Sequence, residues 1–171
     1  MNTTNQFISI PLIFIILIIA FTLLQALLLG HIHIMGVATP LLYTYLALLF
    51  PKTYPKWAQL LLCFTMGLSV DIFSNTPGLA AASMTLIGFI QPYILNLYLS
   101  EEDNPDLMPG FNTLGAIKFT TYAFILVTIY CIVFFSLEAF SSIRWTDWLL
   151  SMAGSLVLTL TFIFTIDSVR R

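Results

Sequence analysis

Charged side chains are scarce in this sequence of 171 residues: six are basic and eight are acidic, which is 8% of the chain. Soluble domains carry about 25% charged residues, so this chain has too little charge to cover a globule that faces water. With 59% apolar residues and a mean hydropathy of +0.97, most of its surface is expected to face lipid. This composition excludes a soluble enzyme and a nucleic-acid-binding protein, and the length allows one domain.

Cysteine and histidine are equally scarce. Cys63 and Cys131 fall inside apolar stretches and are expected at different membrane depths, so they are predicted to be free thiols rather than a disulfide of a secreted scaffold. His31 and His33 are two residues apart with no cysteine or carboxylate nearby, which does not indicate a metal site. The chain also lacks a phosphate-binding glycine loop, a zinc-protease motif and a nucleophile with a histidine in reach. Neither an enzyme nor a cofactor is predicted.

Long apolar runs are what the sequence has instead. A transmembrane helix needs about 20 predominantly apolar residues, and length decides the assignment because the apolar residues run all around each helix. The predicted fold is all-α: a polytopic membrane protein with six transmembrane helices in one compact bundle, forming a single domain over residues 1–171. The six helices are predicted at about 8–30, 34–50, 57–73, 78–99, 116–137 and 148–166.

The distribution of lysine and arginine predicts the orientation. Cytoplasmic loops of membrane proteins carry an excess of these residues. If both termini are cytoplasmic, five basic residues lie inside and only Arg144 lies outside. The five are Lys52, Lys56, Lys118, Arg170 and Arg171. The long connection 100–115 is then cytoplasmic and the outer loops are short.

Asp71 is the most conspicuous ionisable group inside a predicted span, near the outer end of the third helix. A carboxylate at a helix C-terminus opposes the macrodipole, so it is expected to seek donors, the nearest being the Ser74 hydroxyl and the free amides that begin the fourth helix. Thr76 is predicted to be the N-cap of that helix, followed by Pro77. Three roles remain open for Asp71: tying this turn together, contacting a partner, or binding a substrate or ion. Lys118, one turn into the fifth helix, is expected to snorkel to the inner headgroups.

Small and polar residues form stripes at four-residue spacing. The third helix carries Gln59, Cys63, Gly67 and Asp71 on one face. The sixth helix carries Ser151, Ser155 and Thr159, and the fourth is rich in alanine with Gln91 deeper. Such residues permit close approach of helices in lipid. The stripes predict either internal packing of the third, fourth and sixth helices or a seam for a partner's single helix.

The end of the third helix resembles a known family. The pattern Gly67-x-x-x-Asp71-x-x-Ser74, the turn Pro77-Gly78 and the alanine-rich helix that follows resemble MreD, the small rod-shape-determining membrane proteins of bacteria. The detailed match covers residues 57–90, and elsewhere the resemblance is one of hydropathy layout.

This resemblance implies a non-enzymatic scaffold of the cell-elongation machinery in the bacterial inner membrane, helping to control cell shape and peptidoglycan synthesis. The implied partner is an MreC-like single-span protein, which connects indirectly to MreB filaments and peptidoglycan synthases. The five pattern residues would then contact the partner or shape the turn. The MreD fold is considered similar to substrate-binding subunits of energy-coupling-factor vitamin transporters, so a subunit of that kind is the alternative function. The Ala-x-x-x-Ala docking pattern of those subunits is missing, because Ala20 and Ala26 are six residues apart.

Overall fold

The computed structural model describes residues 41–76, 78–99, 108–139 and 145–169, with side chains described throughout except at 145–148. Within these ranges every regular element is helical, which confirms the predicted all-α class. The elements are α2 (Thr44–Leu48), α3 (Lys56–Ser74), α4 (Leu79–Tyr98), α5 (Phe111–Leu114), α6 (Ala116–Ala139) and α7 (Trp145–Val169). Four of them, α3, α4, α6 and α7, are long and apolar enough to cross a membrane.

The predicted helix boundaries agree with these four elements to within a few residues. The largest difference is at α7, which was predicted as 148–166 and extends to Val169, so that it includes Asp167. The predicted span 34–50 enters the described part only from residue 41, where the helix is the five-residue α2. The predicted span 8–30 lies outside the described residues.

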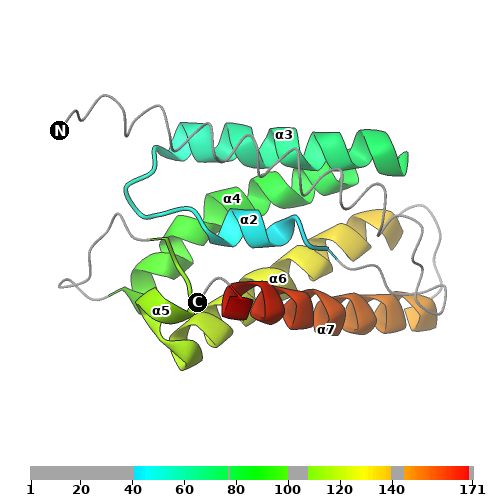
Figure 1. The fold of residues 1–171 in the computed structure, drawn as a ribbon. Coiled ribbons are helices and arrows are strands. Elements are labelled where there is room, and N and C mark those ends of the chain that lie inside the picture. The colour runs from blue at the N-terminus through cyan, green and yellow to red at the C-terminus, as the bar shows by residue number, and fades with distance from the viewer. Residues whose placement is uncertain (1–40, 77, 100–107, 140–144, 170–171) are drawn as a thin grey trace.

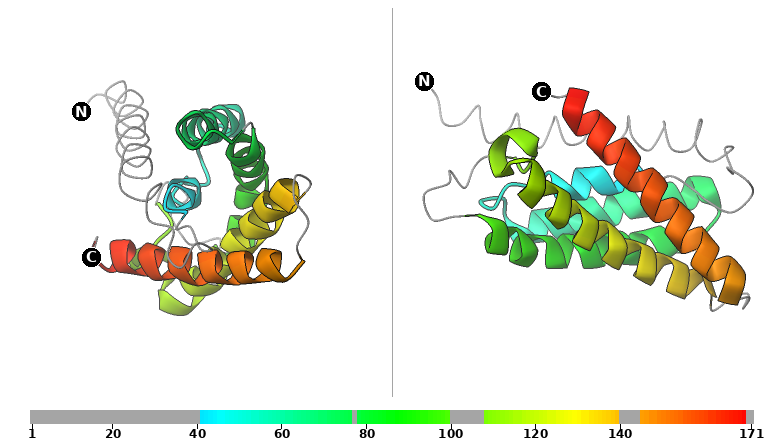
Figure 2. Two further views of the ribbon diagram at one scale, coloured as in Figure 1. Left: turned by 90° about the vertical axis from the view of Figure 1, so that its right-hand side faces the viewer. Right: turned by 90° about the horizontal axis from the view of Figure 1, so that it is seen from below.

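The four long helices form a curved row around α2 (Figure 1). In chain order α3 packs on α4, α4 on α6, and α6 on α7, while α2 packs against α4 and α6. The view along α3 shows α2 inside the curve and α7 crossing obliquely at one end of the row (Figure 2). Because lipid tails are as apolar as leucine, close packing and hydrogen bonds hold such a row together, rather than the hydrophobic effect.

The short helix α2 is completely buried, and its C-terminal carbonyl groups are capped by side chains from other helices. The Tyr122 hydroxyl of α6 donates to the Leu48 carbonyl at 3.0 Å, and Gln91 Nε2 of α4 donates to the Phe50 carbonyl at 3.1 Å. The end of a helix leaves carbonyl groups without partners, and lipid cannot supply donors. Tyr122 and Gln91 therefore allow a helix to end inside the bundle.

Aromatic residues mark the end of the bundle at which α3 begins. Trp57 is 72% exposed, as expected for a ring at the membrane interface. The Tyr54 ring packs on Phe50 with centroids 5.3 Å apart, and partial burial raises the pKa of its hydroxyl, which stays neutral.

Candidate functional site

Gly67 lies where the backbones of α3 and α4 are in close contact. A Cβ atom added to Gly67 would lie 2.5 Å from the Ala80 carbonyl oxygen and 2.5 Å from the Ala81 Cα atom. Such distances are shorter than any real Cβ contact, and both atoms belong to the backbone of α4. Glycine is therefore the residue that lets the two helix backbones meet at this level of the membrane.

The Asp71 carboxylate caps the N-terminus of α4. Its Oδ1 accepts from the Ala80 amide at 2.9 Å and from the Thr76 hydroxyl at 2.7 Å, and its Oδ2 accepts from the Ala81 amide at 2.9 Å. Asp71 is 5% exposed. The first amides of a helix have no partner within it and carry the positive end of its macrodipole. The predicted contact with these amides is confirmed, and the start of α4 compensates for the unfavourable place of Asp71 at the end of α3.

Two left-handed residues shape the turn between α3 and α4. Asn75, with φ of 55°, ends α3, and the Thr76 amide then donates to the Asp71 carbonyl at 3.1 Å, as in a Schellman motif. Gly78, with φ of 81°, is the N-cap of α4, which begins at Leu79.

Two predictions about this turn are wrong. Thr76 is not the N-cap, and the hydroxyl on the carboxylate belongs to Thr76 rather than to Ser74, which is exposed. The reversal at Asn75 brings the chain back so that Thr76 faces Asp71. Pro77 lies outside the described residues, while the other four residues of the predicted pattern all lie on α3 or in its turn to α4.

The stripe predicted on the third helix faces α4 along its whole length. Gln59, Cys63, Gly67 and Asp71 are all buried. Gln59 Nε2 donates to Gln91 Oε1 at 2.7 Å, and a Cβ atom added to Gly88 would lie 2.8 Å from Cys63 Sγ. This face is occupied by internal packing, the first of the two predicted uses.

The stripe predicted on the sixth helix also turns inward, but toward another neighbour. On α7, Ser155 and Thr159 are fully buried. The Thr159 hydroxyl accepts from the Leu41 amide at 3.1 Å. It therefore helps to hold the chain leading into α2, in contrast to the predicted packing with the third and fourth helices.

Asp167 is a second buried carboxylate, which was not predicted from the sequence. It is 4% exposed, near the end of α7. Its Oδ1 accepts from the Tyr45 hydroxyl at 2.8 Å, and its Oδ2 accepts from the Phe111 amide at 2.7 Å. Phe111 is the first residue of α5, so Asp167 joins α7, α2 and α5. Its place directly after a run of apolar and threonine side chains was the available signal, and the predicted helix ended one residue too early to include it.

The remaining polar groups give little sign of a reactive centre. Among the described residues, no three His, Cys, Asp or Glu side chains cluster as metal ligands. His31 and His33 lie outside the described residues. Cys63 and Cys131 are free and buried, as predicted. Lys118 Nζ lies 3.5 Å from the Tyr98 carbonyl at the end of α4, an exposed contact that suits a cation at a helix C-terminus.

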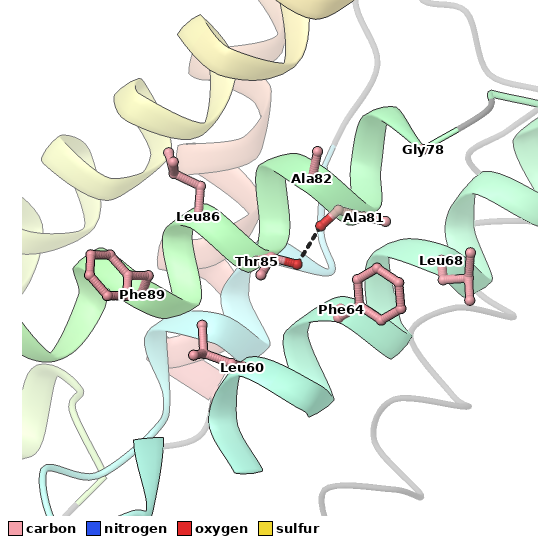
Figure 3. A pocket seen from close by; sticks show the side chains of 9 residues that line it. All are labelled: Leu60, Phe64, Leu68, Gly78, Ala81, Ala82, Thr85, Leu86 and Phe89. Carbon is pink, nitrogen blue, oxygen red and sulfur yellow. Dashed lines mark hydrogen bonds between the residues drawn. The ribbon is translucent and has the colours of Figure 1, made fainter. Parts of the chain in front are cut away.

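An apolar groove runs along the outward side of the α3–α4 hairpin (Figure 3). Its volume is about 680 Å³. It forms where the short side chains of Ala81 and Ala82 on α4 leave space beside Phe64 and Leu68 on α3. Ala81 therefore takes part both in the close backbone contact at Gly67 and in the lining of this groove.

Comparison of the chain with protein-family models, curated protein sequences and solved structures gives no match. The MreD resemblance therefore remains a prediction from residues 57–90, and the four helices establish only that this is a helical protein suited to a membrane.

Proposed function

We propose that this protein is a non-enzymatic scaffold of the bacterial cell-elongation machinery, resembling MreD, which binds the transmembrane helix of an MreC-like partner in the inner membrane. Six spans with both termini in the cytoplasm belong to the same proposal. A scaffold of this kind acts by position, because it raises the effective concentration of its partners without catalytic groups.

The observation that carries this proposal is the use of the two buried carboxylates. Asp71 accepts three hydrogen bonds and Asp167 accepts two, and four of the five donors are a backbone amide or hydroxyl at the start of a helix or in the turn before it. The fifth is the Tyr45 hydroxyl of α2. A carrier or an enzyme needs charged groups that are free to bind and release a substrate or proton. Both carboxylates instead fix one helix against another, which favours a rigid platform.

The outward face of α7 is the seat that we propose for the partner helix. In its most apolar stretch 17% of residues are buried inside the protein, against 33–44% in the other three spans. Exposed residues recur every four positions along it, and in this series Ala153, Val157, Thr161 and Thr165 are small or β-branched, with Phe162 also exposed beside them. The Thr161 and Thr165 hydroxyls donate to carbonyls of α7 itself, at 2.8 and 2.7 Å. The result is a low ridge of the kind that packs into the groove of a second helix.

Photo-crosslinking from α7 in native membranes tests this proposal. A photoreactive residue at Val157, which is 61% exposed, should crosslink to a single-span protein, identified by mass spectrometry as MreC-like. The matched control is Ile132 on α6, which is 44% exposed and should give no such product. Recovery of transporter ATPases and their coupling subunit would contradict the scaffold and favour the substrate-binding subunit of a vitamin transporter. Equal crosslinking from both positions would contradict the seat on α7.

A further inference from the structure

The α3–α4 groove ends in a cationic and aromatic cluster at the membrane border. Leu60 and Phe89 form the end of the groove nearest the start of α3. The Phe89 ring contacts the Tyr93 ring with centroids 5.6 Å apart, and Lys56 Nζ lies 4.9 Å from the Tyr93 centroid. An unbroken series of contacts therefore leads from the apolar groove to a positive charge.

The position of this cluster along α3 corresponds to the headgroup level of one leaflet. Lys56 is the first residue of α3, so it lies where the helix enters the membrane. On α3 the groove begins one turn later at Leu60 and extends to Leu68, a rise of roughly 12 Å at 1.5 Å per residue. Half of the hydrocarbon core is about 15 Å thick. The groove thus has the length of one acyl chain descending from the level of Lys56.

The groove offers contacts to hydrocarbon only. Phe64 and Phe89 are about half exposed along it. The one hydroxyl on its surface belongs to Thr85 and donates to the Ala81 carbonyl at 2.7 Å, so it is turned toward its own helix (Figure 3). A volume of about 680 Å³ is within the range of small-molecule sites, about 300–1,000 Å³.

The charges at the border need an anion. Lys52 and Lys56 are both exposed, and within the described ranges the contact of Lys56 is with the Tyr93 ring and not with a carboxylate. They lie just before and at the positive end of the α3 macrodipole, whose first turn contains no acidic residue. Phosphate is the anion that a lysine and a helix N-terminus bind together most readily.

We propose that this groove holds one acyl chain of an anionic glycerophospholipid, with its phosphate against Lys52, Lys56 and the start of α3. Lysines near a membrane surface favour anionic over zwitterionic lipids, and the Lys56–Tyr93 contact fixes one of them at the mouth of the groove. A partner's apolar helix would fill the groove but leave both lysines without a counter-charge. The site is separate from the α7 ridge, and it does not depend on the proposed function.

Native mass spectrometry of the full chain, released from nanodiscs of equal parts phosphatidylglycerol and phosphatidylcholine, tests the site. The wild type should retain one phosphatidylglycerol, roughly thirtyfold in preference to phosphatidylcholine, as two lysines near the surface imply. Replacing both lysines (Lys52→Gln with Lys56→Gln) should remove the preference. Lys118→Gln, a lysine at the same end but outside the groove, should keep it.

The variant Ala82→Trp tests whether lipid retention depends on the groove or only on the surface charge of the lysines. Tryptophan at this position should fill the groove and abolish retention of either lipid, while tryptophan at the exposed Leu97 of the same helix should have no effect. Retention of both lipids in equal amounts by the wild type, or unchanged retention in Ala82→Trp, would overturn the proposal. Crosslinking of a photoreactive residue at Ala82 to a protein instead of a lipid would overturn it as well. If Ala82→Trp does not fold, the variant that replaces both exposed lysines still tests the proposal through its lipid preference.

Discussion

Asp71 and Asp167 both lie near the C-terminal end of a spanning helix, and both accept hydrogen bonds from the first amides of another helix. They differ in where their donors come from. All three donors of Asp71 lie within ten residues along the chain and belong to one helical hairpin. The donors of Asp167 lie 56 and 122 residues away, on two different elements. The same chemistry closes a local turn at one site and joins three distant segments at the other.

This difference has a structural consequence. The cap at Asp71 supports the contact between α3 and α4, which is the most extensive contact between described helices. The cap at Asp167 positions only α2 and α5, which are five and four residues long. Damage at the first site is therefore expected to affect the whole bundle, and damage at the second to affect one end of it.

The largest effect is expected from Gly67→Leu. Even a Cβ atom at this position would collide with the α4 backbone, so the helices must separate and Asp71 must lose its amides. We expect a loss of more than about 3 kcal/mol, beyond ordinary overpacking, seen as loss of the monodisperse peak in fluorescence-detected size-exclusion chromatography. Thr65→Leu, at an exposed position of the same helix, is the control and should behave as wild type. Normal yield from Gly67→Leu would show that α3 and α4 do not pack as described.

Asp71→Asn is expected to have the next largest effect. The asparagine oxygen can still accept from one amide, but its NH₂ group leaves the buried Ala81 amide without an acceptor. An unsatisfied buried donor costs about 1–3 kcal/mol, which should lower the thermal unfolding temperature in detergent. An unchanged unfolding temperature would show that the Asp71 carboxylate does not contribute to the stability of the fold.

Asp167→Asn should be milder and more local. The Tyr45 hydroxyl can rotate and accept from the new NH₂ group, and the asparagine oxygen can still accept from the Phe111 amide. The main loss is therefore the negative charge that strengthens the hydrogen bond from Phe111. We expect faster hydrogen exchange over residues 108–115 and an unfolding temperature that falls less than in Asp71→Asn. If both variants lower the unfolding temperature equally, the contribution of a cap to stability does not depend on whether its donors are near or distant along the chain.

Thr76→Val should have the smallest effect. It removes one hydroxyl from the Asp71 carboxylate and keeps both amides, so a loss of about 1.5 kcal/mol, the lower end for a hydrogen bond to a charged group, is expected. Combined with Asp71→Asn, the two losses should be less than additive, because both act on one group. Full additivity in this double-mutant cycle would contradict a direct bond between them.

The comparison also explains which features could be predicted from the sequence. The four long helices follow from apolar length, and the stripe from Gln59 to Asp71 follows from four-residue spacing. The amide contacts of Asp71 were predicted because their donors are close in sequence. Thr76 was misplaced because the left-handed Asn75 changes the direction of the chain, and sequence spacing does not show this.

The polar contacts that were missed depend on distant residues. The Asp167 site needs Tyr45 and Phe111, and the capping of α2 needs Gln91 and Tyr122, which no local pattern connects. The short helix α5 was missed within the connection 100–115 because four residues carry no helical periodicity. Polar side chains in a membrane bundle are informative about position, but their partners depend on the fold.

The most direct test of this account is the hydrogen exchange of the Ala80 and Ala81 amides, followed by NMR of the ¹⁵N-labelled protein in detergent micelles. The amides that begin a helix are ordinarily open to exchange. If the Asp71 carboxylate caps α4, both should exchange slowly in the wild type. In Asp71→Asn the Ala81 amide, which loses its acceptor, should exchange distinctly faster and the Ala80 amide should change less, while amides in the middle of α6 stay unchanged. Fast exchange of both amides in the wild type, or equal rates in the two proteins, would contradict the claim that this buried carboxylate serves to hold one helix against another.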